Sequence, residues 1–465
     1  MDSMDYGVLT PAWAGSPVSK LASDAAFVQA MLDVESAWVK VQANAELCTV
    51  AEAHAVAQIA RVELYDLEQL ASRTPDGANA LIPLLGMMRE QLKAHQAPAS
   101  AASALHRGAT SQDIIDSALM LMVSRVIQST VQDLWRTATA LANLAEAHRT
   151  TTCVARSLTQ HALPITFGLR ASNWLSAIRT ATDQLEKLSF PLQWGGAVGT
   201  LASLEQFLHT AYAAPSSAEL TADLARELNL EHARTPWHTN RIPLTTVASA
   251  LAAVTAALGT FGADVLTASR PEIAELSEPR EAGKGGSSAM PQKQNPVHSV
   301  LLRNAALSAP GLLATVFTAA GTAVDERPDG GWHSEWSALR ELLRLASGAA
   351  HHAATLAEGL GVHSERMAQN MQLSGDALLS ERIATVLAPT FPGGKPAIQQ
   401  LVIASLGDGP SLRQLLREQL SEAEFSEPEL DQLLDPADYL GATDRYITHV
   451  LAEYSAWKES WQSQF

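Results

Sequence analysis

Cysteine, aromatic residues and charge are all scarce in this 465-residue chain. The two cysteines, Cys48 and Cys153, form no CxxC pair and no Cys/His spacing typical of a metal site. This pattern indicates a reducing compartment and argues against a disulfide scaffold or a thiolate zinc site. Aromatic residues make up 5% of the chain and charged residues 17%. These fractions argue against an all-β protein and require much of the chain to be buried within itself or against partner subunits.

Signals for secretion, membrane insertion and metal binding are also lacking. The segment Met1–Asp5 is acidic and has no basic stretch followed by an apolar one. We expect no apolar run as long as the about 18 residues that a helix needs to span a bilayer. The histidines are scattered along the chain, so we also expect no metal site. A formal net charge of −17 repels nucleic acid and acidic membranes, so neither is an expected partner. We therefore expect a cytoplasmic protein that binds an anionic substrate only where a few of its own cationic groups lie close together.

Helical periodicity dominates the chain. Apolar residues recur every three or four positions from Met120 to Ala145 and from Val247 to Val265, and a third pattern runs from about 297 to 324. Such long helices predict an all-α fold with a central long-helix bundle completed by other subunits. The alternative is a monomer of separate antiparallel helices. Helix breakers predict three helical domains, namely 1–110, 111–360 and 361–465.

A Gly-rich polar loop lies ahead of the third helical pattern. From Gly283 to Pro296 it reads GKGGSSAMPQKQNP. Glycines let the backbone approach a ligand closely, and the hydroxyls, ammonium and amides that follow are suited to holding carboxylates. A flexible linker with scattered polar residues is the alternative, but a linker has no need of Met290-Pro291 or of a proline just before a helix.

A second candidate site lies at the start of the first long helix, where His106 to Asp113 read HRGATSQD. Ser111 is expected to cap this helix, with an acidic residue in the first turn. Free N–H groups, two hydroxyls and the helix dipole also form a carboxylate site. Thr110 and Ser111 are therefore either helix caps alone or ligands of a carboxylate.

Both segments resemble signature regions of the fumarase/aspartase superfamily, which includes argininosuccinate and adenylosuccinate lyases. GSSAMPQKQNP is similar to one signature, and HxGxTSxDxxD, completed by Asp116, to another. The resemblance implies a metal-free and cofactor-free homotetramer whose active sites are shared between subunits. The roles it implies are Ser287 as the base, Lys293, Asn295, Ser288 and Met290 as substrate contacts, Thr110 and Ser111 as carboxylate ligands, and His106 beside them.

A third region departs from the superfamily pattern. Residues 155–164, ARSLTQHALP, resemble the G-R-T-H region of the lyases, but Leu158 replaces the proton-donating histidine. An amine or hydroxide leaving group needs an acid, whereas a carboxylate, with a conjugate-acid pKa of about 4, departs without one. We therefore expect a carboxylate leaving group. Gln160 remains as a substrate contact, and His161 as a carboxylate ligand or acid/base.

One branch of the superfamily, the 3-carboxy-cis,cis-muconate cycloisomerases of protocatechuate breakdown, meets this condition. RxLxQHALPxTFG, GGAVGTLASL, PWHTxR and GWHSEW resemble that branch, although Arg107 stands where it has an aromatic residue. The resemblance implies lactonisation of a small tricarboxylate through an enediolate, with Lys293 and Asn295 stabilising its charge and Arg241 as a bidentate clamp. A lyase releasing fumarate from adenylosuccinate or argininosuccinate, and a non-catalytic protein on the same fold, stay as alternatives.

Overall fold

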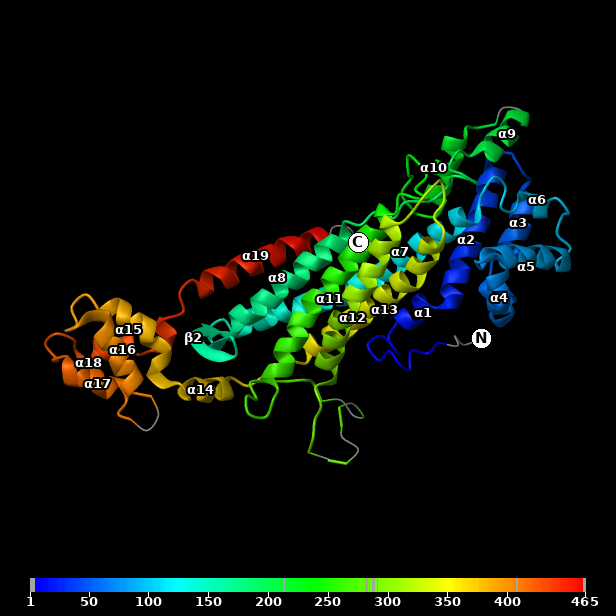
Figure 1. Ribbon diagram of the computed structural model, residues 1–465. Helices are drawn as coiled ribbons and strands as arrows, with labels where there is room; N and C mark the ends of the chain where they lie inside the picture. Colours follow the sequence, from blue (N-terminus) through cyan, green and yellow to red (C-terminus); the bar gives the residue numbers. More distant parts are fainter. Residues whose placement is uncertain are drawn as a thin grey trace. The chain divides into compact units, whose positions relative to one another are not determined.

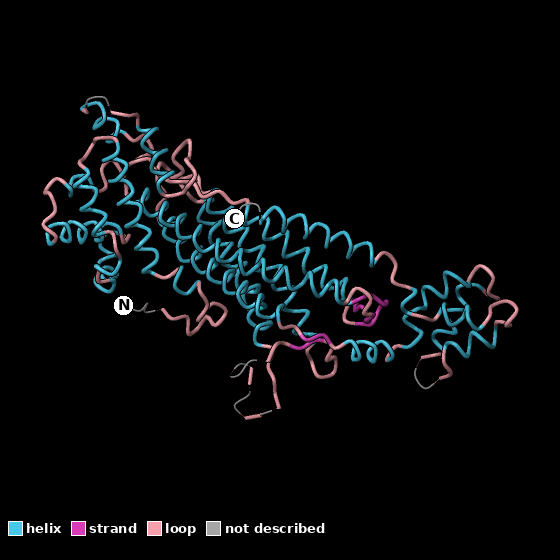
Figure 2. The backbone as a smooth tube through the Cα atoms, turned by 180° about the vertical axis from the view of Figure 1, so that it is seen from behind, coloured by secondary structure: helices cyan, strands magenta, loops and turns pink. Residues whose placement is uncertain are grey.

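The computed structural model describes residues 5–462 apart from 212–213, 281–282, 284, 287–288, 291 and 407–408, and of residues 461 and 462 it describes the backbone alone. Helices account for nearly all regular structure in these residues, and the strands form two short antiparallel pairs (Figure 2). The predicted all-α fold class is therefore confirmed.

The four longest helices of the described residues dominate the fold (Figure 1). They are α7 (Ser111–Ala147), α11 (Ile242–Ala268), α12 (Val297–Gly321) and α13 (Gly330–Glu358). The apolar patterns predicted from Met120 to Ala145 and from Val247 to Val265 lie within α7 and α11. The third pattern ends at Gly321 rather than Val324, and Pro310 lies inside α12 without ending it. Pro310 is exposed, on the side where a helix tolerates the loss of a backbone hydrogen bond best.

Shorter elements fill the rest of the chain. Before α7 lie α1 (Val18–Leu21), α2 (Asp24–Asn44), α3 (Val50–Ile59), α4 (Leu67–Arg73), α5 (Leu81–Ala94) and α6 (Ala101–Ala104). Between α7 and α11 lie β1 (Thr152–Ser157), β2 (Gln160–Thr166), α8 (Phe167–Glu186), α9 (Ala202–Thr210) and α10 (Ser217–Glu227). Strand β3 (Leu276–Ser277) precedes α12, and β4 (Gly361–Val362) follows α13. The chain then continues through α14 (Ser364–Gln372), α15 (Ser380–Leu387), α16 (Gly394–Ala404), α17 (Leu412–Gln419), α18 (Glu427–Leu433) and α19 (Thr443–Gln462).

The chain divides into two compact units, each built from three separate stretches. Unit 1 comprises Met1–Leu134, Ala181–Gly259 and Leu301–His352. Unit 2 comprises Trp135–Thr180, Thr260–Val300 and Ala353–Phe465. The three consecutive domains expected from the sequence stay a prediction, because a division by compactness does not follow the order of the chain.

Two buried tryptophans tie together the elements of unit 1. Trp13 donates its indole N–H to Glu341 Oε1 at 2.8 Å, and the Arg344 guanidinium lies 4.5 Å from its ring centroid. Trp38, fully buried on α2, donates its indole N–H to the Arg107 carbonyl oxygen at 2.9 Å. A buried indole needs such a partner. These bonds therefore hold the N-terminal segment against α13 and fix the loop that leads into α7.

Unit 2 contains the strand pair β1–β2 and a helical cap with a core of its own. In the strand pair Ser157 faces Gln160, so Leu158 and Thr159 form a two-residue turn. The cap lies within the stretch predicted as the C-terminal domain. Its buried core consists of Leu379, Ile383, Ala384, Leu387, Phe391, Ile398, Leu412, Leu416, Leu430, Leu433 and Leu434.

Three helices, α7, α11 and α12, are long and apolar enough to cross a membrane by length and composition alone. The expectation that no apolar run reaches that length is therefore wrong. The chain buries 78% of the most apolar window of α7 and 56% of that of α11, but only 28% of that of α12. Val300, Leu307 and Phe317 are among the exposed residues of α12. This helix thus presents apolar surface that the described part of the chain leaves uncovered.

Replacing Gly348 with alanine is expected to lower the midpoint of thermal unfolding. A Cβ at this buried position of α13 would overlap the Ala12 carbonyl oxygen and lie 2.7 Å from Trp13 Cα, so the N-terminal segment must shift at a cost of about 1 to 3 kcal/mol. Gly86→Ala on α5 is the matched control, because nothing lies within 4 Å of a Cβ there and alanine favours helix. Equal midpoints for the two variants would contradict this packing.

Candidate active site

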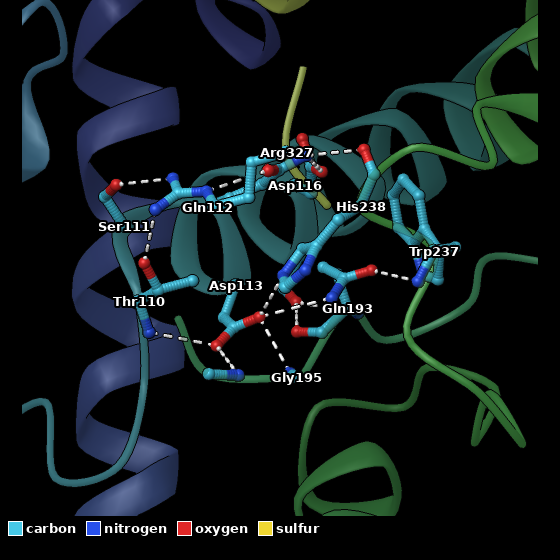
Figure 3. A network of polar contacts seen from close by, with 12 residues as sticks. Thr110, Ser111, Gln112, Asp113, Asp116, Gln193, Gly195, Trp237, His238 and Arg327 are labelled. Atoms are coloured by element: carbon cyan, nitrogen blue, oxygen red, sulfur yellow. Dashed lines mark hydrogen bonds and ion pairs between the residues drawn. The ribbon is translucent and has the colours of Figure 1, made fainter. Parts of the chain in front are cut away.

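The start of α7 carries the hydroxyl pair predicted to hold a carboxylate. The helix begins at Ser111, so Thr110 occupies the position before it and the cap predicted at Ser111 is displaced by one residue. Thr110 is buried and Ser111 half-buried. Both hydroxyls face the same guanidinium, that of Arg327 (Figure 3).

Arg327 is a candidate site residue that the sequence analysis did not identify. Its Nη1 donates to Thr110 Oγ1 at 2.8 Å and its Nη2 to Ser111 Oγ at 3.2 Å, while its Nε donates to Gln112 Oε1 at 3.4 Å. A cation beside two hydroxyls at a helix N-terminus favours a carboxylate through charge, hydrogen bonding and the helix dipole together. The sequence feature that could have identified Arg327 is that it stands alone as a cation in an acidic segment just before GWHSEW.

Asp113 holds the backbone of this site in place. Its fully buried carboxylate accepts hydrogen bonds from several segments of unit 1 (Figure 3). The partners are the backbone N–H groups of Thr110 (2.9 Å), Gly195 (2.8 Å) and Gly196 (2.9 Å), Gln193 Nε2 (3.2 Å) and His238 Nε2 (2.9 Å). A buried carboxylate is tolerated only where such donors replace water. Asp113 therefore fixes the first turn of α7 to the Gly-Gly turn.

The Gly-Gly turn beside Asp113 leaves no room for side chains. A Cβ at Gly195 would lie 2.7 Å from Pro236 Cβ and 2.9 Å from His238 Cε1. Gly196 has a φ of +69°, in the left-handed region that favours glycine. The GGAVGT stretch thus places two backbone N–H groups where larger residues would keep them away from Asp113.

His106, predicted to lie beside the substrate, is held by a buried glutamate. Its Nδ1 lies 2.8 Å from Glu35 Oε1, and its backbone N–H donates to Glu35 Oε2 at 2.9 Å. Glu35 is fully buried on α2. His106 has a φ of 56°, and such strain in a residue other than glycine is typical of functional sites. The contact with Glu35 at Nδ1 fixes the orientation of the ring.

Arg241, predicted to clamp a substrate carboxylate, is instead engaged within the protein. It is 2% exposed. Its Nη1 donates to Asp116 Oδ2 at 2.6 Å and its Nη2 to Asp116 Oδ1 at 3.1 Å, and Nη2 also donates to Glu335. Two carboxylates already share this cation, and a clamp needs N–H groups that face a ligand. In Arg327 each Nη has one acceptor among the described residues, which leaves the second N–H of both Nη atoms for a ligand, so Arg327 is the better candidate for a clamp.

The predicted Gly-rich polar loop from Gly283 to Pro296, named the Gly-Ser loop from here on, is described only in part. Ser287 and Ser288 lie outside the described residues. Lys293 and Met290 are exposed, and Asn295 is half-buried. The backbone N–H of Asn295 bonds across the loop at 2.8 Å. The roles of these residues as proton carrier and substrate contacts stay predictions.

Leu158, which by the resemblance stands where the lyases have a histidine, lies at the tip of the β1–β2 hairpin. It is 93% exposed, and Leu158 and Thr159 have φ values of 50° and 70°. Two successive left-handed residues make the tight hairpin turn that glycine and asparagine normally occupy. The hairpin therefore displays a strained, apolar tip, with Gln160 exposed beside it at the start of β2.

His161, predicted as an acid/base, is half-buried on β2. Its Nδ1 lies 2.8 Å from Ser374 Oγ, and it lines a cavity of about 540 Å³. Burial, and after it the nearby Arg156 cation, lower the pKa of His161. A lowered pKa favours the neutral ring, which can accept a proton. The predicted residues thus form two groups, with His106, Thr110 and Ser111 in unit 1 and the Gly-Ser loop and hairpin residues in unit 2.

The chain is similar to known enzymes along nearly its whole length. Residues 11–311 match the model of a family described as Lyase. The chain is 41% identical over 447 residues to the nitrosuccinate lyase of Streptomyces davaonensis, covering 94% of this chain and 93% of that protein. It is 39% identical over 450 residues to the 3-carboxy-cis,cis-muconate cycloisomerase of Pseudomonas aeruginosa, covering 95% of each. A solved structure, the 3-carboxy-cis,cis-muconate lactonizing enzyme from Pseudomonas putida, matches with a TM-score of 0.89 at 32% identity, over 97% of this chain and 100% of that one.

Replacing Asp113 with asparagine is expected to destabilise the protein by on the order of 3 kcal/mol, because an amide nitrogen would face donors for which the described residues offer no other acceptor. Chemical denaturation would measure the change. Asp264→Asn is the control: Asp264 is exposed and accepts one indole N–H, from Trp174 at 2.8 Å, so its loss should cost less than about 1 kcal/mol. Similar losses in both variants would argue against Asp113 as the organising residue.

Proposed function

The chain belongs to this lyase family, part of the fumarase/aspartase superfamily, and from that starting point we propose that it is a cycloisomerase. It interconverts 3-carboxy-cis,cis-muconate and the γ-lactone 4-carboxymuconolactone, a step of protocatechuate breakdown. Cycloisomerases of that name are similar to the chain over most of its length, at 30% to 39% identity.

The observation that carries this proposal is Leu158 at the hairpin tip. Leucine cannot give a proton to a leaving group, so the bond that breaks must release an anion that is stable without protonation. In the lactone that anion is a carboxylate of the substrate itself. In the opposite direction, lactone formation, the carboxylate oxygen adds to an alkene carbon, and this oxygen needs no acid to become reactive.

The site at α7 is suited to holding a carboxylate that does not react. Arg327 supplies a charged, two-pronged donor, and the Thr110 and Ser111 hydroxyls accompany it. His106, oriented by Glu35, lies four residues before Thr110. A polyanionic substrate meets a chain of net charge −17, so its affinity depends on cations placed close to the carboxylates.

The reacting end of the substrate is assigned to the Gly-Ser loop. As the carboxylate oxygen bonds to the alkene carbon, the alkene electrons move toward a second carboxylate and form an enediolate. Lys293, Asn295 and loop amides stabilise this charge, and Ser287 delivers the proton that completes the new C–H bond. His161 is the alternative proton carrier, because burial lowers its pKa and the neutral ring that this favours can accept a proton. No cofactor takes part in these steps.

Elimination of nitrite from nitrosuccinate is the second candidate, favoured by the 41% identity to a nitrosuccinate lyase. Nitrite, like a carboxylate, is the anion of a weak acid and leaves without protonation. Leu158 is therefore compatible with both reactions. Both reactions place negative charge on a carboxylate next to the carbon that gains or loses a proton, so both need the same kind of stabilised enediolate.

The proposed assembly is a homotetramer in the cytoplasm, without nucleic-acid or membrane partners. Exposed apolar residues of α12, Val300, Leu307 and Phe317, support a subunit interface that covers this helix. Cys48 and Cys153 are both free thiols, which supports a reducing compartment.

Parallel assays on two substrates test the function. With 3-carboxy-cis,cis-muconate the wild-type enzyme is expected to lower the ultraviolet absorbance of the conjugated diene as the lactone forms. Its kcat/KM should exceed that for nitrosuccinate, measured by nitrite release, by at least about 100-fold. Nitrite release at the higher kcat/KM would select the second candidate. Fumarate release from adenylosuccinate or argininosuccinate, with neither of the other activities, would overturn both.

The mass of the active species tests the assembly. Light scattering during gel filtration at micromolar concentration is expected to give four times the chain mass of 49.5 kDa, because four chains together bury their α12 faces. Leu307→Lys on α12 should shift the mass toward smaller species by placing a charge in the interface. A wild-type monomer that turns over substrate would refute shared active sites.

A further inference from the structure

A buried ion cluster of three residues lies directly behind the carboxylate site. Asp116 on α7, Arg241 just before α11 and Glu335 on α13 are each at most 2% exposed. Arg241 donates two hydrogen bonds to Asp116, at 2.6 and 3.1 Å, and binds both oxygens of Glu335. The cluster thus joins the starts of three long helices through one guanidinium.

Two side chains connect Asp116 to Arg327. Gln112 donates to Asp116 Oδ2 at 3.1 Å through Nε2 and accepts from Arg327 through Oε1 at 3.4 Å (Figure 3). Trp332 donates its indole N–H to Asp116 Oδ1 at 2.9 Å, and the Arg327 guanidinium lies 5.8 Å from the Trp332 ring centroid. Arg327 is therefore in contact with two groups that are both anchored on one buried carboxylate.

The charge of this cluster depends on whether Glu335 carries a proton. With Glu335 neutral, Asp116 and Arg241 balance each other. With Glu335 ionised, one cation faces two carboxylates, and a net negative charge lies buried behind the anion site. The charged groups that face Glu335 are Arg241 and Asp116. Burial raises the pKa of Glu335 to about 7, against the opposing effect of Arg241.

We propose that the Asp116–Arg241–Glu335 cluster is a positioning unit for Arg327, and that protonation of Glu335 increases the affinity of the site for substrate carboxylates. This inference rests on the proposed function of the Thr110–Ser111 site. The physical reason is that a buried charge is weakly screened, so an extra negative charge behind Arg327 opposes the approach of an anion. Glu335 touches no reacting atom in this arrangement, so it acts on binding rather than on the chemical step.

The test is the pH dependence of KM, measured between pH 6 and 8 with whichever substrate the wild-type enzyme turns over. Because burial raises the pKa of Glu335 to about 7, the ionised fraction of this carboxyl increases across the range, while the substrate carboxylates are ionised throughout. Wild-type KM is expected to rise about fivefold with pH, and kcat is expected to be independent of Glu335. In Glu335→Gln, KM should stay at its low-pH value across the range.

Glu341→Gln is the matched control. Glu341 lies on the same helix, and burial raises its pKa as well, but its partners are Trp13 and Arg344 rather than Asp116. This variant should keep the wild-type KM profile. If Glu335→Gln does not fold, Trp332→Phe replaces it, because it keeps the ring beside Arg327 and removes the bond to Asp116. KM should then rise about threefold with kcat retained, and an unchanged KM would count against the positioning role.

The outcomes separate this inference from the function it rests on. If the wild-type enzyme turns over neither 3-carboxy-cis,cis-muconate nor nitrosuccinate, the proposed function fails. If it turns over either one and its KM profile is flat, or is the same in Glu335→Gln, the inference is overturned and the proposed function stands.

Discussion

The buried carboxylate of Asp113 is the constraint on which the candidate site depends. One side chain collects donors from the start of α7, the Gly-Gly turn and the segment that holds His238. Because an uncompensated buried charge costs several kcal/mol, these segments cannot separate without leaving it unpaired. The positions of Thr110 and Ser111 follow from that requirement.

Asp116, one helical turn after Asp113, performs a different task. Asp113 accepts mostly backbone N–H groups and so fixes the chain, whereas Asp116 accepts from side chains and so orients them. Residues three apart on a helix lie on the same side. A single face of α7 therefore carries the anchor for the loops and the anchor for the groups around Arg327.

The chemistry proposed for the enzyme is defined by a missing acid as much as by the groups present. By the resemblance, Leu158 occupies the position of the lyases' proton donor, and we propose that the enzyme therefore acts only on leaving groups that are stable as anions. The remaining task is to hold several negative charges in a protein that is itself strongly negative. In unit 1 we propose this task for the Arg327 guanidinium, the Thr110 and Ser111 hydroxyls and the start of α7. In unit 2 we propose it for the Lys293 ammonium and the amide groups of the Gly-Ser loop.

The sequence by itself determined the helical class and the family, and it supplied the segments that we propose to bind carboxylates. These follow from periodicity along one chain and from motifs whose residues are consecutive, as in HRGATSQD and GKGGSSAMPQKQNP. Only the tertiary structure decided which arginine faces the hydroxyls and which is buried. Arg241 and Arg327 are both isolated cations in the sequence. Their different roles depend on Asp116 and Glu335, residues 125 and 94 positions away from Arg241, because pairing of charges across such distances is set by packing and not by local pattern.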